Sequence, residues 1–346
     1  MKKVIEEAPA PNIDPEAREK TLKACVDACK EIGYVGAGTF EFLYQDGAFY
    51  FIEMNTRVQV EHPVSEMVTG VDIVEKQFQI ASGESIENMK YLENGYGLEV
   101  RVNAEKAVLD SEGNVSFVPT PGEITRCELP EDDDFRLISM AGEGKVVSPF
   151  YDSLIIQIIC HGKDRNDAIA KMADYLDRVV INGVYTNITL IRKILQDEVF
   201  IKGEYDTGYL PAFLNRIDAE ALIREIEEAS GAGGTGLSLE MLAIDDSDEL
   251  KVLSPSTGVF YRTPSPSEPE YVNVGDIVTT EYILCQLEAM KMFTPVNLNS
   301  FAAEDGELYP SDRRYEITRI NITTRQQVNE GDLLFVIKPL VEEAAA

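Results

Sequence analysis

The chain has 346 residues, enough for two or three domains at roughly 150 residues each. Its 61 acidic and 31 basic residues give a formal net charge of −30, which repels phosphate backbones and anionic lipid surfaces. We therefore expect neither nucleic acid nor a membrane as a partner. No run of about 18 apolar residues occurs, so we expect no membrane-spanning helix.

Cysteine usage and the first residues bear on the cellular compartment. The five cysteines are an odd number without regular spacing, which fits reduced thiols better than a disulfide framework. Residues 1–7 lack the apolar core of a secretion signal. Both observations predict a cytoplasmic location. With only two histidines, His62 and His161, a histidine-rich metal site or a histidine-dependent triad is not expected.

The first two thirds of the chain mix helical and strand patterns, which predicts an α+β fold up to about residue 215. Apolar residues recur at three- and four-residue steps after Pro15, and Asp46-Gly47 separates two runs rich in aromatic residues. Helices are expected at 15–32, 63–81 and 167–180, and strands at 39–44, 49–54 and 153–160.

The last third of the chain has a different pattern of predicted secondary structure. A charged helix is expected at 217–229, and Ser230–Gly236 has the composition of a flexible linker. From about residue 250, short strands and turns predict an all-β module of about 90 residues. A weak repeat at an offset of 50 matches Val278, Leu284 and Cys285 to Val328, Leu334 and Phe335. This repeat is consistent with two similar sheet halves packed around a pseudo-twofold axis.

Two glutamates in the predicted hairpin form a candidate metal site. If the loop is the three-residue Asp46-Gly47-Ala48, Glu41 faces Glu53 directly, and Asn55 shares their face. Opposed carboxylates repel each other, and a divalent cation such as Mg²⁺ or Mn²⁺ would remove that repulsion. The alternative is an ordinary solvent-facing side of a half-buried sheet. A two-residue loop would place the glutamates on opposite faces and weaken the metal interpretation.

A dense polar string follows the hairpin and favours a functional site. Arg57, Gln59, Glu61 and His62 occur within a few residues of one another. An arginine can bind a small oxyanion with two parallel hydrogen bonds, and Glu61 could act on that anion as a general base. A buried core does not need so many polar side chains, so we expect Arg57 and Glu61 to act on a small anion.

These residues resemble biotin carboxylase, the ATP-grasp component of biotin-dependent carboxylases. The resemblance is carried by Glu41-Phe42, by Phe51-Ile52-Glu53-Met54-Asn55-Thr56-Arg57-Val58-Gln59-Val60-Glu61-His62-Pro63-Val64 and by Thr69-Gly70-Val71-Asp72. It extends upstream through Lys3–Pro11 and downstream through Glu99–Glu105, Pro119–Gly122 and Tyr151–Ser153.

The resemblance implies roles in binding ATP and its metal ions. Glu41, Glu53 and Asn55 would hold the Mg²⁺ or Mn²⁺ ions on the ATP phosphates. Leu43 and Ile52 would flank the adenine as apolar walls.

The resemblance also implies a bicarbonate and biotin site. The expected ligands of bicarbonate or carboxyphosphate are Lys3, Arg57, Gln59 and the backbone of Val60. Glu61 would deprotonate bicarbonate so that it attacks the γ-phosphate of ATP. Arg101 would stabilise the ureido oxygen of biotin as an enolate and so make its nitrogen nucleophilic.

A second resemblance lies in the all-β module. Glu288-Ala289-Met290-Lys291-Met292 resembles the attachment motif of biotin carboxyl carrier domains, which implies that Lys291 carries biotin. Ser254–Arg262 and Gly275-Asp276 are also similar to this domain. The flanking methionines offer adaptable apolar contacts. The alternative is an ordinary surface lysine in a turn.

The chain departs from the family pattern in two places. Biotin carboxylases carry an N-terminal domain and a glycine-rich phosphate loop before the position of Lys3, and neither is found here before the hairpin. We therefore expect an N-terminally truncated protein that binds ATP poorly alone. The polar stretch Ala302–Glu316 is longer than usual and is interpreted as an insertion that either contacts a partner or weakens the carrier fold.

Together these features predict four regions: a C-terminal part of an ATP-grasp domain at 1–96, a biotin carboxylase C-terminal domain at 97–215, a charged helix and linker at 216–250, and a biotinyl/lipoyl-like flattened barrel at 251–340. The expected protein is an acyl-CoA carboxylase α-chain of acetyl- or propionyl-CoA type.

The resemblance further implies several partners and two other interpretations. The expected partners are a separate carboxyltransferase subunit, a biotin protein ligase and further copies of the chain bound through the carboxylase part. The alternative is a non-catalytic carrier or assembly fragment. A pyruvate-type carboxylase is disfavoured, because the linker leads directly to the carrier module with no room for a carboxyltransferase barrel.

Overall fold

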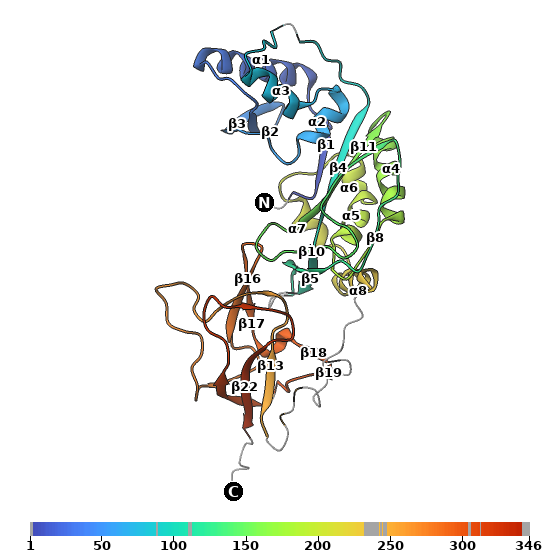
Figure 1. Ribbon diagram of the computed structural model, residues 1–346. Helices are drawn as coiled ribbons and strands as arrows, with labels where there is room; N and C mark the ends of the chain where they lie inside the picture. Colours follow the sequence, from blue (N-terminus) through green and yellow to red (C-terminus); the bar gives the residue numbers. More distant parts are fainter. Residues whose placement is uncertain are drawn as a thin grey trace.

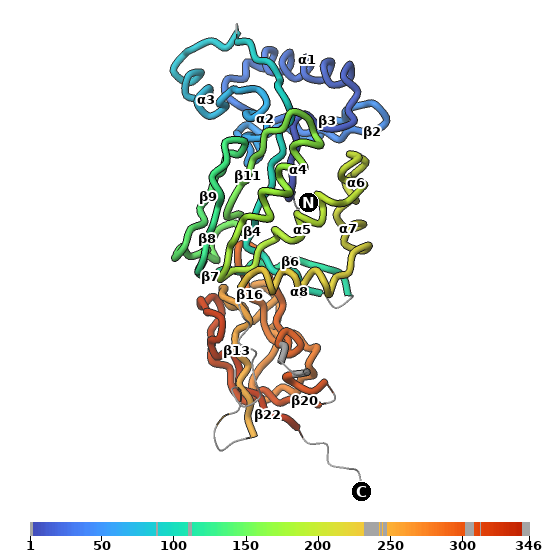
Figure 2. Tube along the Cα trace, turned by 90° about the vertical axis from the view of Figure 1, so that its right-hand side faces the viewer, coloured from blue at the N-terminus to red at the C-terminus, as the bar shows by residue number. Residues whose placement is uncertain are grey.

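The computed structural model describes residues 3–87, 89–109, 113–231, 242, 244, 248–303, 306–311 and 313–340. Three parts follow one another along the molecule: an N-terminal lobe, a central domain and a C-terminal β-domain, called the carrier domain below (Figure 1). The view turned by 90° shows the same succession (Figure 2). Most of the predicted glycine-rich linker, residues 232–236, lies outside the described residues.

The N-terminal lobe contains a hairpin and three helices. Its elements are α1 (Pro15–Ile32), β2 (Thr39–Gln45), β3 (Ala48–Asn55), α2 (His62–Thr69) and α3 (Ile73–Ala81). Helix α1 has its predicted bounds, because Asp14 caps its first turn and Gly33 ends it in the left-handed region. The predicted helix over 63–81 is wrong: Gly70, at φ +66°, ends α2, and Asp72 caps a separate α3.

A four-stranded antiparallel sheet forms the centre of the molecule. Its strand order is β1 (Ile5–Ala8), β4 (Tyr96–Asn103), β11 (Leu154–Gly162) and β9 (Phe135–Ser139). Leu98, Val100 and Val102 are fully buried in the core that includes α4 (Arg165–Arg178). The intervening residues of β4 point to the other face, where Gly97 lies against Val64 of α2. That face of the sheet therefore meets the N-terminal lobe.

The remainder of the central domain consists of short strand pairs and helices around this core. The strands are β5 (Glu105–Leu109), β6 (Val115–Pro119), β7 (Gly122–Glu123), β8 (Arg126–Glu128), β10 (Val146–Val147) and β12 (Val180–Asn182). The helices are α5 (Ile188–Leu195), α6 (Glu198–Ile201), α7 (Tyr209–Leu214) and α8 (Ala219–Ser230). None of the helices in the described ranges combines the length and apolarity needed to cross a bilayer.

Buried polar contacts fix β1 to the central domain. Glu7 accepts hydrogen bonds from Arg165 Nε at 2.8 Å, from the hydroxyl of Tyr205 at 2.5 Å and from the hydroxyl of Tyr96 at 3.1 Å. Asn12 donates to the carbonyl of Gly203 at 3.0 Å. These contacts hold the strand that contains Glu6 and begins two residues after Lys3.

The carrier domain is built from two similar four-stranded sheets. One sheet has the order β13 (Leu250–Leu253), β22 (Leu333–Leu340), β20 (Arg314–Ile320) and β15 (Ile277–Val278). The other has the order β17 (Met292–Val296), β16 (Cys285–Ala289), β14 (Gly258–Tyr261) and β21 (Gln327–Val328). The repeat at an offset of 50 relates β15 to β21 and β16 to β22, and all six repeat residues are buried. The repeat thus relates strands at equivalent positions of two similar sheet halves, and the pseudo-twofold axis between them stays a prediction.

The predicted insertion folds back onto the carrier domain. It includes a short pair, β18 (Ala302–Ala303) and β19 (Gly306–Glu307). Leu308 and Tyr309 then enter the carrier core, and the hydroxyl of Tyr309 donates to the carbonyl of Lys251 at 2.7 Å. Residues 308–309 therefore add to the core of the carrier fold.

The close approach of β11 to α4 gives a first testable prediction. A Cβ at Gly162 would lie 2.5 Å from the backbone nitrogen of Ala168, so Gly162→Ala must push the strand and the helix apart. We expect it to cost about 1–3 kcal/mol of stability and to lower the midpoint of thermal unfolding. Gly142→Ala is the matched control, because the nearest atom to its Cβ is Lys145 Cγ at 3.4 Å. Equal midpoints for the two variants would contradict this account of the packing.

Candidate active site

The β2–β3 hairpin places Glu41 opposite Glu53 by a route that differs from the predicted one. The loop has two residues, Asp46 and Gly47, both with positive φ, as a type I′ turn requires. That register alone would put the two glutamates on opposite faces. A register shift in β3 at Ile52 corrects it, so that Glu41 pairs with Glu53 and Thr39 pairs with Asn55.

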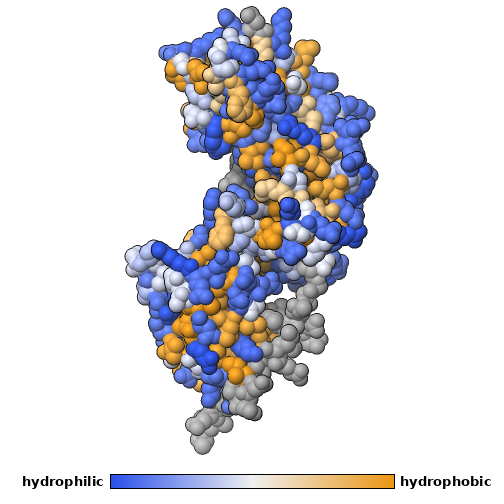
Figure 3. Space-filling view, in the orientation of Figure 1, coloured by the Kyte–Doolittle hydropathy of each residue, from blue (hydrophilic) through white to orange (hydrophobic). Residues whose placement is uncertain are grey.

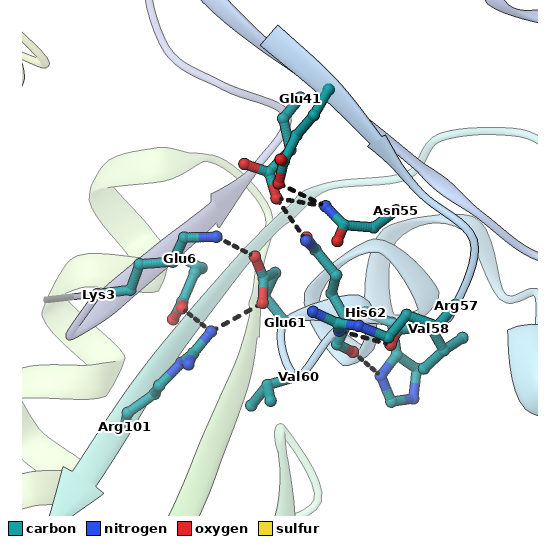
Figure 4. Close-up of polar contacts among 12 residues, drawn as sticks. Lys3, Glu6, Glu41, Asn55, Arg57, Val58, Val60, Glu61, His62 and Arg101 are labelled. Carbon is teal, nitrogen blue, oxygen red and sulfur yellow. Dashed lines mark hydrogen bonds and ion pairs between the residues drawn. The ribbon is translucent and has the colours of Figure 1, made fainter. Parts of the chain in front are cut away.

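Two side-chain amides hold these opposed carboxylates together. Asn55 Nδ2 donates to Glu41 at 3.0 Å and to Glu53 at 3.2 Å. Gln59 Nε2 donates to Glu41 at 2.5 Å (Figure 4). The positive ends of these amide dipoles lie between the two acids and offset part of their repulsion.

The donor set fits a hard divalent cation. It offers two carboxylates and one amide oxygen, which are the ligand types that Mg²⁺ and Mn²⁺ prefer when they also bind phosphates. Asn55 would have to turn its oxygen toward the ion, because its nitrogen now faces both acids. Within the described ranges no group of three or more acidic, thiol or imidazole side chains forms a closed metal cluster. An ion here would therefore share its coordination with a substrate.

A second polar cluster surrounds Glu61, where β1 and β4 meet the loop before α2. Lys3 Nζ donates to one carboxylate oxygen of Glu61 at 2.6 Å, and Arg101 Nη2 donates to the other at 2.8 Å. Arg101 also forms an ion pair with Glu6 at 2.5 Å (Figure 4). The sequence predicted Lys3, Glu61 and Arg101 as functional residues, and the structure brings all three into contact.

The surroundings of Glu61 keep it ionised. Burial alone would raise the pKa of this carboxyl group. The hydrogen bond from Lys3, the hydrogen bonding to the backbone and the positive charges of Lys3 and Arg101 act in the opposite direction. Together they outweigh burial, so the pKa lies below its ordinary value. Glu61 is therefore a carboxylate at neutral pH. It can accept a proton once its two cationic partners turn to another anion.

Two buried acids behind Arg101 were missed at the level of sequence. Glu6 and Glu99 are directly paired across β1 and β4, and Glu99 is fully buried. Burial is the main cause that raises the pKa of Glu6 to about 7 and that of Glu99 to about 8. Glu99 is thus largely protonated at neutral pH. The available signal was a glutamate two positions before Arg101 in an otherwise apolar strand.

Gln157 of β11 connects these acids to the active-site loop. Its side-chain amide donates to Glu99 Oε1 at 2.8 Å and to the carbonyl of Val60 at 2.8 Å. The backbone of Val60, a predicted bicarbonate ligand, is thereby held against the central sheet.

Three predicted site residues lie apart from these contacts. Arg57 does not take part in the contacts of Glu61 and instead donates to the carbonyl of Val58 at 3.3 Å (Figure 4). Leu43 and Ile52, the predicted adenine walls, are 49% and 52% exposed. Leu43 is two positions from Glu41 on β2 and so shares its face of the hairpin.

Lys291 lies at the tip of the β16–β17 hairpin of the carrier domain. Ala289 pairs with Met292, and Met290 and Lys291 form the turn with φ of +52° and +64°. The turn exposes the Lys291 side chain. Among the described residues it has no hydrogen-bond or ion-pair partner, so it is accessible for modification.

Comparison with known families agrees with this three-part organisation. Residues 1–89 match the carbamoyl-phosphate synthase L chain ATP-binding domain, and residues 99–212 match the biotin carboxylase C-terminal domain. Residues 250–308 match the biotin-requiring enzyme family. Three successive segments of the chain are thus similar to an ATP-binding domain, a biotin carboxylase C-terminal domain and a biotin-requiring domain. The fold of the chain is that of partial ATP-grasp and biotin carboxylase segments followed by a biotinyl domain.

Individual relatives support the same assignment. Biotin carboxylase from Pseudomonas aeruginosa is 50% identical over 210 residues, which are 60% of this chain and 45% of the relative. One similar solved structure is the biotin carboxylase domain dimer of Hydrogenobacter thermophilus 2-oxoglutarate carboxylase, in complex with MgADP, ADP and bicarbonate. It is 42% identical with a TM-score of 0.56, and the match covers 60% of this chain and 46% of that chain. A single-chain, multi-domain long-chain acyl-CoA carboxylase is 27% identical with a TM-score of 0.57 and covers 99% of this chain and 31% of that chain.

The extent of these matches limits what they say about the whole protein. This chain spans about half the length of the curated biotin carboxylases that it matches. The two family matches at 1–89 and 99–212 include the Glu41–Glu53 hairpin, the Glu61 loop and Arg101.

The buried acids give a second testable prediction. Their pKa values in the folded chain, about 7 and about 8, exceed the ordinary value of 4.5, so the folded state retains protons that the unfolded chain releases. The free energy of unfolding should therefore fall as the pH rises from about 4.5 to about 8, with each retained proton contributing a slope of about 1.4 kcal/mol per pH unit. Glu99→Gln should flatten this slope in urea unfolding.

Glu198→Gln is the control for the pH dependence, because the Glu198 side chain is 84% exposed. It should leave the slope as in the unaltered chain. If Glu99→Gln also retains the full slope, Glu99 is not the group that holds the proton.

Proposed function

We propose that this chain is the part of a biotin-dependent carboxylase that binds bicarbonate and biotin and carries the biotin itself. The proposed reaction is the ATP- and bicarbonate-dependent carboxylation of biotin on Lys291, followed by transfer of the carboxyl group to an acyl-CoA by a separate carboxyltransferase subunit. The main support is the contact of Lys3, Glu61 and Arg101, which places a carboxylate between two cations in the chain that also carries the Lys291 turn.

The first step proposed for this site is the deprotonation of bicarbonate. Lys3 and Arg101 would turn from the two oxygens of Glu61 to the bicarbonate anion, with Arg57 and the Gln59–Val60 segment completing its binding. Glu61 would then accept the bicarbonate proton on the freed oxygen, because its lowered pKa keeps it ionised at neutral pH. The deprotonated anion would attack the terminal phosphate of ATP.

The hairpin would bind the nucleotide in this reaction. Glu41, Glu53 and Asn55 would hold Mg²⁺ or Mn²⁺, which neutralises the charge on the phosphates. Leu43 and Ile52 would flank the adenine from the same lobe. The bound MgADP and bicarbonate of the Hydrogenobacter structure, on a related domain, support this choice of ligands.

Arg101 would have a second task after bicarbonate has reacted. Biotin on Lys291 supplies the ureido nitrogen that receives the carboxyl group. Arg101 would present its guanidinium to the ureido oxygen of biotin, where negative charge develops, while Glu6 holds the guanidinium through their ion pair.

Several finer points belong to the same proposal. The proposed type is an acetyl- or propionyl-CoA carboxylase; the direct passage from the central domain to the carrier domain disfavours a pyruvate-type carboxylase. The named dimer of the Hydrogenobacter domain supports self-association through the carboxylase part. A biotin protein ligase would modify Lys291, and the five free cysteines fit the cytoplasm.

A second candidate function is a biotin carrier without catalysis of its own. The supporting observation is that the N-terminal lobe is open: α1 has no buried residue, and both proposed adenine walls are about half exposed. In this case Lys291 would still carry biotin, but the carboxylation step would take place on another protein.

Biotin attachment is the third testable prediction. After co-expression with an active biotin ligase, intact mass and peptide mapping should find one biotin, on Lys291. Lys291→Arg should remove it completely, whereas Lys338→Arg, on the exposed part of β22, should leave it in place. An unmodified Lys291, beside a control substrate that the ligase does modify, would contradict both candidate functions.

Catalysis by Glu61 is the fourth testable prediction and separates the two candidates. In the assembled carboxylase, Glu61→Gln should lower the bicarbonate-dependent cleavage of ATP by about 10²- to 10⁴-fold, because the general base is lost. Biotinylation of Lys291 should stay unchanged in that variant. An unchanged rate of ATP cleavage would leave only the carrier function.

A further inference from the structure

One methionine of the biotin attachment turn is buried outside its own domain. Met290 is 5% exposed and belongs to the hydrophobic cluster of the central domain, whereas the carrier domain has a separate cluster. Met292, on the other side of Lys291, is 44% exposed. The turn therefore makes a one-sided contact in which Met290 faces the central domain.

A backbone hydrogen bond fixes the orientation of this contact. The amide of Met290 donates to the carbonyl of Pro149 at 2.6 Å, and β17 approaches β6 beside it. Met290 and Lys291 both have positive φ, so the turn presents one backbone amide and one apolar side chain to the central domain. We call the surface formed by Pro149 and β6 the turn seat.

One acidic residue of the carrier domain lies within electrostatic reach of the β5–β6 pair. Glu330, between β21 and β22, lies near Lys106 of β5. Partial burial raises the pKa of Glu330, and the positive charge of Lys106 acts in the opposite direction. Lys106 is ion-paired with Glu227 of α8 at 2.7 Å, so its charge acts on Glu330 without a direct ion pair between the two.

The turn seat is connected to Arg101 by a short path through the sheet. Arg101 and Asn103 are two residues apart on β4, and Asn103 donates to the hydroxyl of Ser153 at 3.0 Å. Pro149 precedes Ser153 by only four residues. The lengths of these segments place the seat within roughly 30 Å of Arg101.

The overall shape agrees with this path. The β16–β17 turn forms the lower wall of the hollow between the N-terminal lobe and the carrier domain, and the start of β1 lies on the same side (Figures 1 and 3). Lys291 is exposed in this position. An arm attached to it is free to extend into the hollow.

We propose that the turn seat is the docking position of the carrier domain during biotin carboxylation, in which Met290 anchors the attachment turn so that the Lys291 arm reaches the Arg101 site. The docking of the carrier domain does not depend on the proposed function, whereas the delivery of biotin to Arg101 rests on the proposed function. Met290 is a positioning residue in this arrangement, and Met292 remains free to contact other partners.

Hydrogen exchange tests the docking on the whole chain, with or without biotin. Backbone amides in 115–118, 150–151 and 288–292 should exchange about tenfold faster in Met290→Ala than in the unaltered chain. Met292→Ala is the matched control and should retain the protection. Exchange in β22 should be the same in all three proteins, which shows that the carrier fold is intact.

A second variant opens the seat without touching the attachment motif. Glu330→Lys brings a positive charge toward Lys106 and should also accelerate exchange at 115–118 and 150–151. The Glu330→Lys variant still tests the docking if Met290→Ala disturbs the fold of the carrier domain. Equal protection in both seat variants and in the unaltered chain would overturn the docking.

A nitroxide in place of biotin tests the delivery. Lys291→Cys would carry the label in a chain whose partly exposed Cys25, Cys29 and Cys127 are replaced by serine. The label should broaden the amide resonances of β1 and of Arg101, and adding Met290→Ala should remove that broadening. If hydrogen exchange shows that the turn is docked but the label broadens neither β1 nor Arg101, the turn does not deliver biotin to the Arg101 site. This conclusion holds whatever the catalytic activity of the assembled enzyme.

Discussion

The guanidinium of Arg101 balances the negative charge on which the site depends. It forms ion pairs with Glu6 and Glu61, and the charge of Arg101 also acts on the buried Glu99. Without this cation, the carboxylates of Glu6 and Glu61 would repel each other in a poorly solvated space beside the largely protonated Glu99. The contact between the N-terminal lobe and the central sheet is therefore held by the same guanidinium that is proposed to bind substrate. Substrate binding and the contact between the two domains are thus coupled at Arg101.

The sequence predicted much of the site because its motifs are local. The bounds of α1, the hairpin and the pairing of Glu41 with Glu53 could all be read from capping, periodicity and turn residues. The reason given for the pairing was wrong, since the loop is shorter and a register shift at Ile52 restores it. Such a shift adds one residue to one strand, and periodicity along that strand alone does not show it.

Other features depend on contacts between distant segments. Glu6 and Glu99 are about 90 residues apart and become a pair only through the register of β1 with β4. The sequence indicated that the methionines around Lys291 would make adaptable contacts, but which of them is buried depends on how the carrier domain meets the β5–β6 pair. These contacts were therefore beyond reach of a single sequence.

The open face of the N-terminal lobe has a consequence for the behaviour of the chain in solution. Phe40, Phe42, Phe49 and Phe51 line a groove of about 560 Å³ beside α1, and Leu22 and Val26 of that helix are about half exposed. Apolar surface of this kind favours self-association, which the net charge of −30 opposes through repulsion between molecules. Added salt shortens the reach of that repulsion to about 8 Å at physiological ionic strength. The colloidal stability of the chain is thus set by ionic strength, with dilute buffers favouring dispersed molecules.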